Sequence, residues 1–584
     1  MNNSKRHRNK LLSALLIASF LLMTSQYYSS TIIPAKASLP DQTFNCLATG
    51  QAYETGSSYS GNYNYTKTVD GVYHKSIGMR GYEEGQRTYE LILNYTFDTG
   101  KSARIIPNLS KVEVNGEART NIATTKGASV FVYIYKYKQE TWEQIASFYG
   151  STANTQFTWS NTSDALNYVS NEGKMQLQWS FFTYQGDFTT LWVDYQSAKL
   201  TLKPFKWNFM VYVAADWYRD VVPEPGTGDA WAAEDINEME TVGSTADVAV
   251  TVQIDYFTNT VTSKDGRLFI VKDTNTSSIS SPYLTTTSQY HMGWSNTLAE
   301  FINWSVSNFP AERCALVLWD HGFGWKGSCE DTNGNNSPPE SNPPDILTTS
   351  ELHNGLSVAK NYTGRTINLI GFMACLMQNT EVAYEIRDYA NVFVASEEVI
   401  RSDIGWRFDA ILSFLTSNPS IDEELLAQII VWDYECHCNG ISIPDFPPTL
   451  SSVNISRMVN LATFVDDFAS ALIGDLDSVR NQINMCRGQS REFGVDPDLI
   501  DLYNFTEATL GISNTTIQNA ANALLCEISN ATVIYEWHDQ TKDAHGTSIY
   551  FPKISTDYNG NMYGSLDFTS THWDEFLEAY LGVQ

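Results

Sequence analysis

LVLWDHGFGW, residues Leu316–Trp325, is the stretch that decides the fold of the larger part of this chain. Its unbroken apolar run is typical of a β-strand that is buried on both faces, and the run ends in His321 and a glycine-containing turn. Residues Asn368–Met377 (NLIGFMACLM) repeat this form and deliver Cys375 just before a helix that we expect to start near Asn379. We therefore predict two strands of one sheet that each end in a reactive side chain.

Further apolar runs surround these two strands, and segments with helical spacing separate them. The runs and two of the helical segments are Asn208–Ala215, Val248–Val252, Ala315–Trp319, Ile367–Ile370, Val392–Ala395, Thr297–Val306 and Thr380–Tyr389. Buried strands that alternate with helices predict an α/β domain whose mostly parallel sheet carries helices on both faces. Active sites of such sheets lie beyond the carboxyl ends of the strands, where we expect His321 and Cys375.

A cysteine and a histidine in these positions have the chemistry of a nucleophile and its acid/base partner. The thiolate attacks carbonyl groups readily, and a helix N-terminus or a nearby imidazole favours the thiolate. The imidazole of His321 then protonates the leaving amine. The N–H groups of Gly322 and Cys375 would form an oxyanion hole, at about 3 kcal/mol per donor. Taken singly, a buried cysteine or histidine is more often structural, and only the shared context reverses that interpretation.

The two strand ends resemble the signature blocks of clostripain-like cysteine peptidases. Their separation, 375 − 321 = 54 residues, is also the caspase-like spacing of histidine and cysteine. Four further stretches match in order, namely Trp207–Asp216 (WNFMVYVAAD), Val394–Glu398 (VASEE), Gly405-Trp406 and Gly546–Pro552 (GTSIYFP). The resemblance covers residues 204–584 and implies a caspase-like peptidase domain with a His321/Cys375 dyad and a protein or peptide substrate.

One position departs from the family pattern. Members commonly carry Asp two residues before the cysteine, where it lines the pocket for Arg or Lys, and this chain has Met373. A thioether cannot pair with a guanidinium group. Asp403 stands where a second pocket carboxylate is expected, although it could equally be a solvated loop acid. A preference for Arg or Lys before the cleaved bond is therefore a hypothesis that depends on Asp403.

Two other properties of the family are self-cleavage and Ca²⁺ dependence, and the sequence bears on each of them differently. Some relatives cut themselves between His and Cys, but Gly327–Ala359 holds no Lys or Arg, so self-cleavage is expected at most after Lys326. No cofactor is required by the predicted chemistry, whereas Ca²⁺ dependence occurs in the family. The candidate ligands are Asp216, Glu234, Asp235 and Glu238, and their spacing is not that of an EF-hand.

The chain before residue 204 differs from the rest in amino-acid composition and in hydropathy pattern. Residues 38–203 are rich in Tyr, Thr, Gly and Asn, and short alternating runs such as Ser129–Tyr135 are separated by turn residues. This pattern predicts an antiparallel β-sandwich. The stretch Trp142–Ile145 loosely resembles jelly-roll accessory domains of secreted enzymes, which often bind carbohydrate. Aromatic side chains in such a domain more often fill its core than stack on sugar rings, so packing is the favoured interpretation.

The first 37 residues have the form of a secretory signal. A basic start precedes the apolar run Leu11–Met23, and Ala35-Lys36-Ala37 precedes Ser38 as a small-x-small cleavage signature. The run is short for a membrane span, although a retained anchor is the alternative. We predict a signal peptide over 1–37, a sandwich domain over 38–203 and a peptidase domain over 204–584, in a secreted protein that is not inserted in a membrane.

The net charge limits the possible binding partners of the chain, and the cysteine content limits its disulfides and metal sites. The net charge of −29 argues against nucleic acid as a partner, because phosphate backbones would be repelled. Eight scattered cysteines indicate a few disulfides at most. Cys436-His437-Cys438 lacks a second pair at metal-ligand spacing, so a disulfide or two buried thiols is favoured there.

Two other functions compete with the peptidase. In the first, the peptidase fold is a catalytically silent scaffold and the sandwich binds a surface polymer or carbohydrate; Met373 favours it, whereas His321, Gly322 and Cys375 oppose it. The second is a glycosidase, for which no carboxylate pair stands out. Thiol labelling distinguishes the first from an active peptidase.

Overall fold

The computed structural model describes residues 39–55, 57–60, 74–77, 79–83, 86–98, 103–121, 128–183, 190–216, 218–219, 226–257, 264–275, 278–332, 345–439, 441, 446–494, 498–539 and 543–583. The predicted signal peptide lies outside the described residues. None of the helices in the described ranges combines the length and the apolar character that a membrane span requires.

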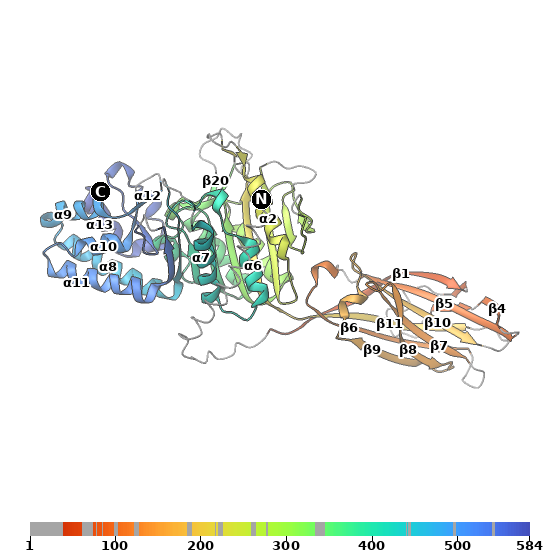
Figure 1. Ribbon diagram of the computed structural model, residues 1–584. Helices are drawn as coiled ribbons and strands as arrows, with labels where there is room; N and C mark the ends of the chain where they lie inside the picture. The colour runs from red at the N-terminus through yellow and green to blue at the C-terminus, as the bar shows by residue number, and fades with distance from the viewer. Residues whose placement is uncertain are drawn as a thin grey trace. The chain divides into compact units, whose positions relative to one another are not determined.

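Antiparallel strands make up the chain before residue 204. They are β1 (Gln42–Thr55), β2 (Ser57–Ser60), β3 (His74–Ile77), β4 (Met79–Glu83), β5 (Gln86–Asp98), β6 (Leu109–Thr120), β7 (Ser129–Lys136), β8 (Thr141–Tyr149), β9 (Thr155–Asn161), β10 (Lys174–Thr183) and β11 (Thr190–Leu202). β1 pairs with β11 at its start and with β5 further on, so it belongs to two sheets. One sheet continues through β10 and β7 to β8, and the other through β6 to β9 (Figure 1).

A single apolar cluster lies on the inner side of these strands. Period-2 alternation places Val130, Val132 and Ile134 of β7 in it, with Trp179 of β10 and Val114 of β6. The alternation thus predicts the strands correctly. The jelly-roll arrangement and the domain boundary at residue 204 stay predictions.

The second half of the chain is built on a mixed sheet in the order β17-β16-β15-β12-β18-β21-β22-β23-β26. Its strands are β12 (Phe205–Ala215), β15 (Val248–Tyr256), β16 (Gly266–Phe269), β17 (Tyr283–Thr286), β18 (Ala311–Trp319), β21 (Ile367–Met373), β22 (Ala390–Ala395), β23 (Thr449–Asn454) and β26 (Val533–His538). The central strands, β15 to β22, are parallel, as predicted. The edge strands pair antiparallel, so the sheet is mixed rather than mostly parallel.

Helices cover both faces of this sheet, as the continuous apolar strands predict. On β12, Phe209, Val211 and Val213 join the apolar cluster of α2 (Gly228–Val242), α6 (Phe408–Ser417) and α7 (Glu423–Cys438) (Figure 1). Met210 and Tyr212 face the opposite cluster, which includes α3 (Ser295–Asn308) and α4 (Thr349–Thr363). Burial of alternate residues on opposite faces explains why the strand sequence is apolar throughout.

Further helices follow in the last third of the chain. They are α5 (Thr380–Glu385), α8 (Met458–Gly474), α9 (Leu476–Gln489), α10 (Leu502–Thr509), α11 (Thr515–Glu527), α12 (Gly560–Tyr563) and α13 (Trp573–Leu581). α8 packs against both α11 and α13, and their apolar side chains belong to the same cluster as α3 and α4. Short strands occur at β13 (Tyr218–Arg219), β14 (Gly226–Thr227), β19 (Gly327–Asp331), β20 (Asp345–Thr348), β24 (Glu492–Phe493), β25 (Leu499–Asp501) and β27 (Ser548–Tyr550).

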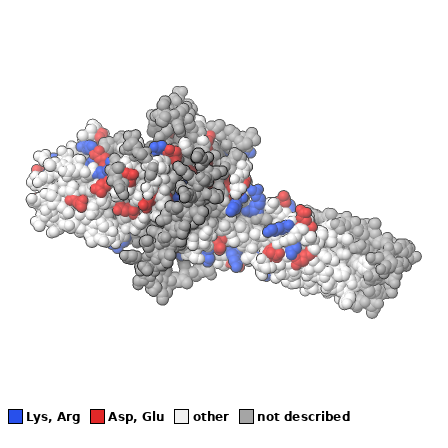
Figure 2. Space-filling model, in the orientation of Figure 1, with Lys and Arg blue, Asp and Glu red and all other residues white. Residues whose placement is uncertain are grey.

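Figure 2 shows acidic and basic side chains scattered over the described part of the face in view. Dispersed charge of this kind favours solubility rather than the binding of one polyion.

Candidate active site

The predicted histidine and cysteine stand beyond the ends of two neighbouring parallel strands. In the register of β18 and β21, Trp319 lies opposite Met373, and each is the last residue of its strand. His321 and Cys375 each follow that pair by two residues. The Asp320 N–H donates to the Met373 carbonyl oxygen at 3.4 Å, so the two segments run side by side past the sheet edge.

Gly322 is the point of closest approach between the two segments. A Cβ atom placed on Gly322 would lie 2.1 Å from the carbonyl oxygen of Cys375 and 3.0 Å from its backbone nitrogen. Carbon and oxygen atoms that are not bonded cannot approach to 2.1 Å, so no side chain fits here. Gly322 also forms an isolated antiparallel bridge with Ser328. The structure therefore brings the backbone of His321 and Gly322 against that of Cys375.

The nucleophile candidate lies in a tight turn. Cys375 is half-buried, its sulfur forms no disulfide, and its thiol lies 3.6 Å from the carbonyl oxygen of Ile400. The next residue, Leu376, has a φ of 64°, which is a left-handed conformation that branched side chains rarely adopt. Such strain costs about 1–3 kcal/mol and persists only where the surroundings hold it.

Glu398 holds this turn from two directions. Its backbone carbonyl accepts from the Leu376 N–H at 3.2 Å. Its buried carboxylate accepts from the Gly494 N–H and from Arg491 Nη2, each at 2.8 Å, and Gly494 packs against the Leu376 side chain. Breaking a buried ion pair by removal of one partner costs about 3–5 kcal/mol. Glu398 and Arg491 are therefore positioning residues for the turn, and sequence analysis missed them although Glu398 closes the VASEE block.

Strand β27 is joined by hydrogen bonds to the residues that follow the Cys375 turn. The Ser548 N–H of β27 donates to the Gln378 carbonyl oxygen at 3.0 Å, and Thr380 Oγ1 donates to the Ser548 carbonyl oxygen at 2.8 Å. Helix α5 starts at Thr380 with Asn379 as its cap, as predicted. Because Cys375 precedes that cap by four residues and α5 is one short element, its dipole adds little at the sulfur.

The histidine segment is held by the loop that follows it. The Cys329 N–H donates to the His321 carbonyl oxygen at 3.3 Å, and the Phe323 N–H donates to the Gly327 carbonyl oxygen at 2.9 Å. The Asp320 carboxyl group lies in the protein interior, and burial raises its pKa well above the ordinary value. At this buried position beside the histidine, a neutral carboxyl group costs less free energy than an ionised carboxylate would.

Two other described cysteines, Cys436 and Cys438, lack the properties of a reactive thiol. The described cysteines form no disulfide, and Cys46 has no described side chain. The pair Cys436 and Cys438 consists of thiols, one exposed and one buried. Burial raises the pKa of Cys436 to about 11 and that of Cys438 to about 12, so neither is a thiolate near neutral pH.

The two predicted specificity residues lie in different surroundings. Met373 is buried in an apolar cluster with Trp319, Ile404 and Trp406. Asp403 is about half exposed, and its carboxylate accepts from Arg401 Nη2 at 2.6 Å and from Arg401 Nε at 2.9 Å. The carboxylate thus already binds a guanidinium group in fork geometry.

The acids proposed as calcium ligands do not assemble into one site. Asp235 accepts from Trp319 Nε1 at 2.6 Å, and Glu238 accepts from the Phe408 N–H at 3.1 Å. Burial raises the pKa of Asp235 well above its ordinary value and that of Glu238 to about 7. Both groups therefore serve the packing of α2. Of the four proposed ligands, Asp216 alone joins a carboxylate cluster within the described ranges.

That cluster consists of Asp216, Asp255 and Asp331, and sequence analysis missed the last two. All three are buried, and one oxygen of each lies within 4.8 Å of the others. Gln289 Nε2 donates to Asp216 at 3.2 Å and to Asp255 at 3.1 Å. Burial raises the pKa of Asp255 well above its ordinary value, and Asp265 acts in the same direction. An all-oxygen set of this charge fits Ca²⁺, which prefers carboxylates and amide oxygens.

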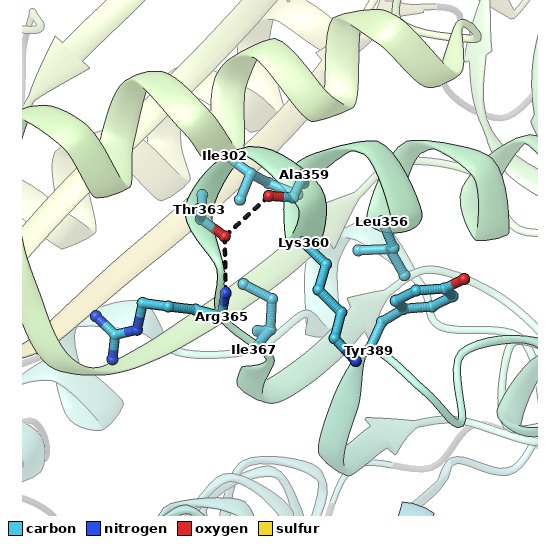
Figure 3. A pocket seen from close by; sticks show the side chains of 8 residues that line it. All are labelled: Ile302, Leu356, Ala359, Lys360, Thr363, Arg365, Ile367 and Tyr389. Carbon is cyan, nitrogen blue, oxygen red and sulfur yellow. Dashed lines mark hydrogen bonds between the residues drawn. The ribbon is translucent and has the colours of Figure 1, made fainter.

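A shallow cavity elsewhere in the domain takes no part in the site. Ile367, the first residue of β21, lines it with Lys360 and Arg365 (Figure 3). Cys375 follows the opposite end of the same strand. The cations are also engaged, since Lys360 Nζ donates to the Asp388 carbonyl oxygen at 2.7 Å and Arg365 Nη2 to that of Glu312 at 2.6 Å.

Comparison with known proteins assigns the family. Residues 226–580, more than half of the chain, match the model of the clostripain family of peptidases, so the chain belongs to the clostripain family. Clostripain from Hathewaya histolytica is 24% identical in an alignment 361 residues long, and the match covers 50% of this chain and 63% of that protein. The chain thus spans less than two thirds of the length of this relative.

Solved structures show weaker likeness. A secreted C11 cysteine protease from Bacteroides thetaiotaomicron, in complex with an irreversible peptide inhibitor, is 18% identical and covers 64% of this chain and 99% of its own, with a TM-score of 0.45. TmCBM61 in complex with β-1,4-galactotriose is 8% identical and covers 27% of this chain and 87% of its own, with a TM-score of 0.17. At these TM-scores neither likeness carries an argument.

The close approach at Gly322 leads to a direct prediction. In Gly322→Ala, the new methyl group must push the Cys375 turn away, and kcat/KM on any peptide substrate should fall about 100-fold or more. Gly488→Ala is the matched control, because a Cβ at Gly488 meets nothing within 4 Å. Gly488→Ala should unfold near the wild-type temperature, and Gly322→Ala below it, because its collision is with a backbone atom that cannot rotate away. Unchanged turnover in Gly322→Ala would contradict the geometry described.

Calcium binding stays a prediction, now attached to Asp216, Asp255 and Asp331. Calorimetric titration with Ca²⁺ should give saturable heat, and Asp255→Asn should weaken Kd about tenfold because one carboxylate charge is lost. The exposed Asp477→Asn, in α9, should bind as the wild type does. Absence of heat in the wild type, together with an unfolding temperature that Ca²⁺ leaves unchanged, would reject the site.

Proposed function

We propose that this chain is a secreted cysteine endopeptidase that uses a Cys375/His321 dyad. The observation that carries the proposal is the contact of the Gly322 backbone with the Cys375 backbone at the ends of two adjacent parallel strands. Membership of the clostripain family supports the reaction class. Secretion is inferred from the signal sequence over 1–37, which would make Ser38 the first residue of the mature protein.

The chemistry proceeds in two halves. His321 takes the proton of the Cys375 thiol, and the sulfur attacks the carbonyl carbon of the substrate. The Gly322 and Cys375 N–H groups donate to the resulting oxyanion. The C–N bond breaks as His321 returns the proton to the leaving amine, which leaves a thioester. Water then attacks the thioester carbon, His321 accepts a proton from that water, and the acid product departs as the thiol re-forms.

Replacement of the nucleophile is the decisive test. Cys375→Ala should abolish hydrolysis of casein and of a peptide library while the unfolding temperature stays near that of the wild type. Cys526→Ala, which removes an exposed cysteine, should leave turnover unchanged. A peptidyl chloromethyl ketone should label the wild type at one cysteine and fail to label Cys375→Ala. Residual proteolysis in purified Cys375→Ala would refute the mechanism.

The same labelling distinguishes the peptidase from the silent-scaffold alternative. Gly322 does not separate the two, because a side chain there would collide with the Cys375 backbone in an inactive fold as well. Labelling of Cys375 without hydrolysis of any library member would favour the scaffold. Labelling with hydrolysis favours the peptidase.

We also infer that Asp403 governs a preference for Arg or Lys before the cleaved bond. Asp403 lies three residues from Ile400, whose carbonyl oxygen is 3.6 Å from the Cys375 sulfur. Its carboxylate binds Arg401 in the bidentate geometry that a substrate guanidinium would use. A substrate cation would have to displace Arg401. Met373, in its apolar cluster, supplies no second charge.

This hypothesis predicts opposite effects for two substitutions. Asp403→Asn should lower the ratio of kcat/KM for Arg over norleucine substrates about tenfold, whereas Arg401→Ala should raise it by removing the competing cation. Norleucine at the cleaved position is the internal control, since it makes no ion pair. If neither substitution changes the ratio of kcat/KM for Arg over norleucine substrates, or if the wild type prefers norleucine, the specificity is assigned to the apolar cluster around Met373 instead.

A further inference from the structure

The sheet that contains β7 and β8 carries a row of aromatic side chains on its outer face. Val130, Val132 and Ile134 of β7 point into the core. The residues between and after them, Phe131, Tyr133 and Tyr135, therefore point outward, and each is half-buried rather than enclosed. None of these three belongs to the apolar cluster of that core.

The neighbouring strand extends this row. In the β7–β8 register, Tyr135 lies opposite Trp142, and Ser129 lies opposite Tyr149. The rings of Tyr135 and Trp142 are 5.1 Å apart at 66°, and those of Phe131 and Tyr133 are 6.4 Å apart. Tyr149 is 70% exposed. Rings from β7 and β8 thus lie on the same outer side of the sheet, as two contacting pairs and Tyr149, and we call these five residues the aromatic strip.

Amide side chains flank the aromatic strip. Gln144 of β8 lies opposite Tyr133 on one side, and Gln178 of β10 lies opposite it on the other. Asn94 of β5 lies opposite Gln178, and Gln178 Nε2 donates to Asn94 Oδ1 at 3.0 Å. An amide offers both donors and acceptors, and a mutual hydrogen bond holds these two in place beside the rings.

The aromatic strip is uncharged, although the chain has a net charge of −29. In β7 and β8 the charged residues point elsewhere: Lys136 Nζ lies 2.8 Å from Glu143, and Glu143 accepts from the hydroxyl of Tyr168, a core residue. The outward positions named above are aromatic, amide or serine side chains. A polyanion or polycation would find no counter-charge there. Aliphatic anchors, which an apolar protein partner would use, are also missing from those positions.

We propose that the aromatic strip is a binding site for a neutral polysaccharide. The apolar faces of pyranose rings would stack on Tyr133, Tyr135 and Trp142, and the sugar hydroxyls would hydrogen-bond with Gln144 and Gln178. Stacking on rings that are already held by their neighbours costs little side-chain entropy. The site lies outside the peptidase machinery, so its binding and the peptide hydrolysis are independent activities of one chain.

The test uses the full chain in affinity electrophoresis through gels that contain single polymers. The neutral polymers are hydroxyethyl cellulose, xylan, galactan, glucomannan and mixed-linkage glucan, and the charged ones are polygalacturonate and heparin. We expect retardation by at least one neutral polymer and by neither charged one. Trp142→Ala and Tyr133→Ala should weaken that retardation about tenfold or more, and Trp142→Phe should restore part of it.

Controls separate this outcome from unfolding and from the peptidase. Tyr362→Ala removes an exposed tyrosine, 71%, from α4 and should leave retardation unchanged. The strip variants should keep the wild-type unfolding temperature and the wild-type kcat/KM on peptides. Absence of retardation by every neutral polymer would overturn the proposal. Retardation by charged polymers alone would overturn it too, as would a dimer in light scattering that Trp142→Ala dissociates.

Discussion

The contact between the Gly322 and Cys375 backbones is the constraint on which the rest of this site depends. It follows from the parallel pairing of β18 and β21, which carries two chain segments past the sheet edge at the same level. A hydrogen atom is all that fits between them, so the histidine segment fixes where the cysteine turn lies. The left-handed conformation of Leu376 then becomes necessary for the chain to leave the strand end. Glu398 and Arg491 offset that strain by holding the turn from outside.

The structure behind the turn relies on buried acids that are neutral or paired. Glu381, in α5, accepts from the Tyr563 hydroxyl at 2.7 Å and from the Tyr550 N–H at 3.0 Å, and burial raises its pKa to about 7. A carboxyl whose pKa is raised on folding stabilises the fold fully below its ordinary value of 4.5, and that contribution declines as pH rises towards 7. Glu398, by contrast, is paired with Arg491 at 2.8 Å. One buried acid behind the cysteine turn is thus held by hydrogen bonds from uncharged donors and the other by an ion pair.

Sequence predicts the parts of this molecule that local pattern controls. Apolar runs predict the central parallel strands, and the strand ends place His321 and Cys375 together because parallel strands share one edge. The pairing of Glu398 with Arg491 joins residues 93 positions apart, and no local pattern encodes it. The same holds for Asp255 and Asp331, which meet Asp216 only through the fold. The role of Asp403 in the pocket stays a prediction, and its engagement with Arg401 depends on side-chain geometry that spacing does not contain.

The aromatic strip shows that the register of strand pairing is needed to tell which of two alternating sets of side chains faces outward. Alternation in Ser129–Tyr135 indicates that two sets of side chains face opposite ways, and it does not say which set is the core. Packing was therefore the favoured interpretation of the aromatic residues. The register of β7 with β8 and β10 resolves the choice, because the valines and isoleucine meet the core residues Leu177, Trp179 and Phe181, while the rings meet Gln144 and Gln178. Rings placed among amides on the outer side cannot contribute to that core, so their conformational order serves the surface on which they lie.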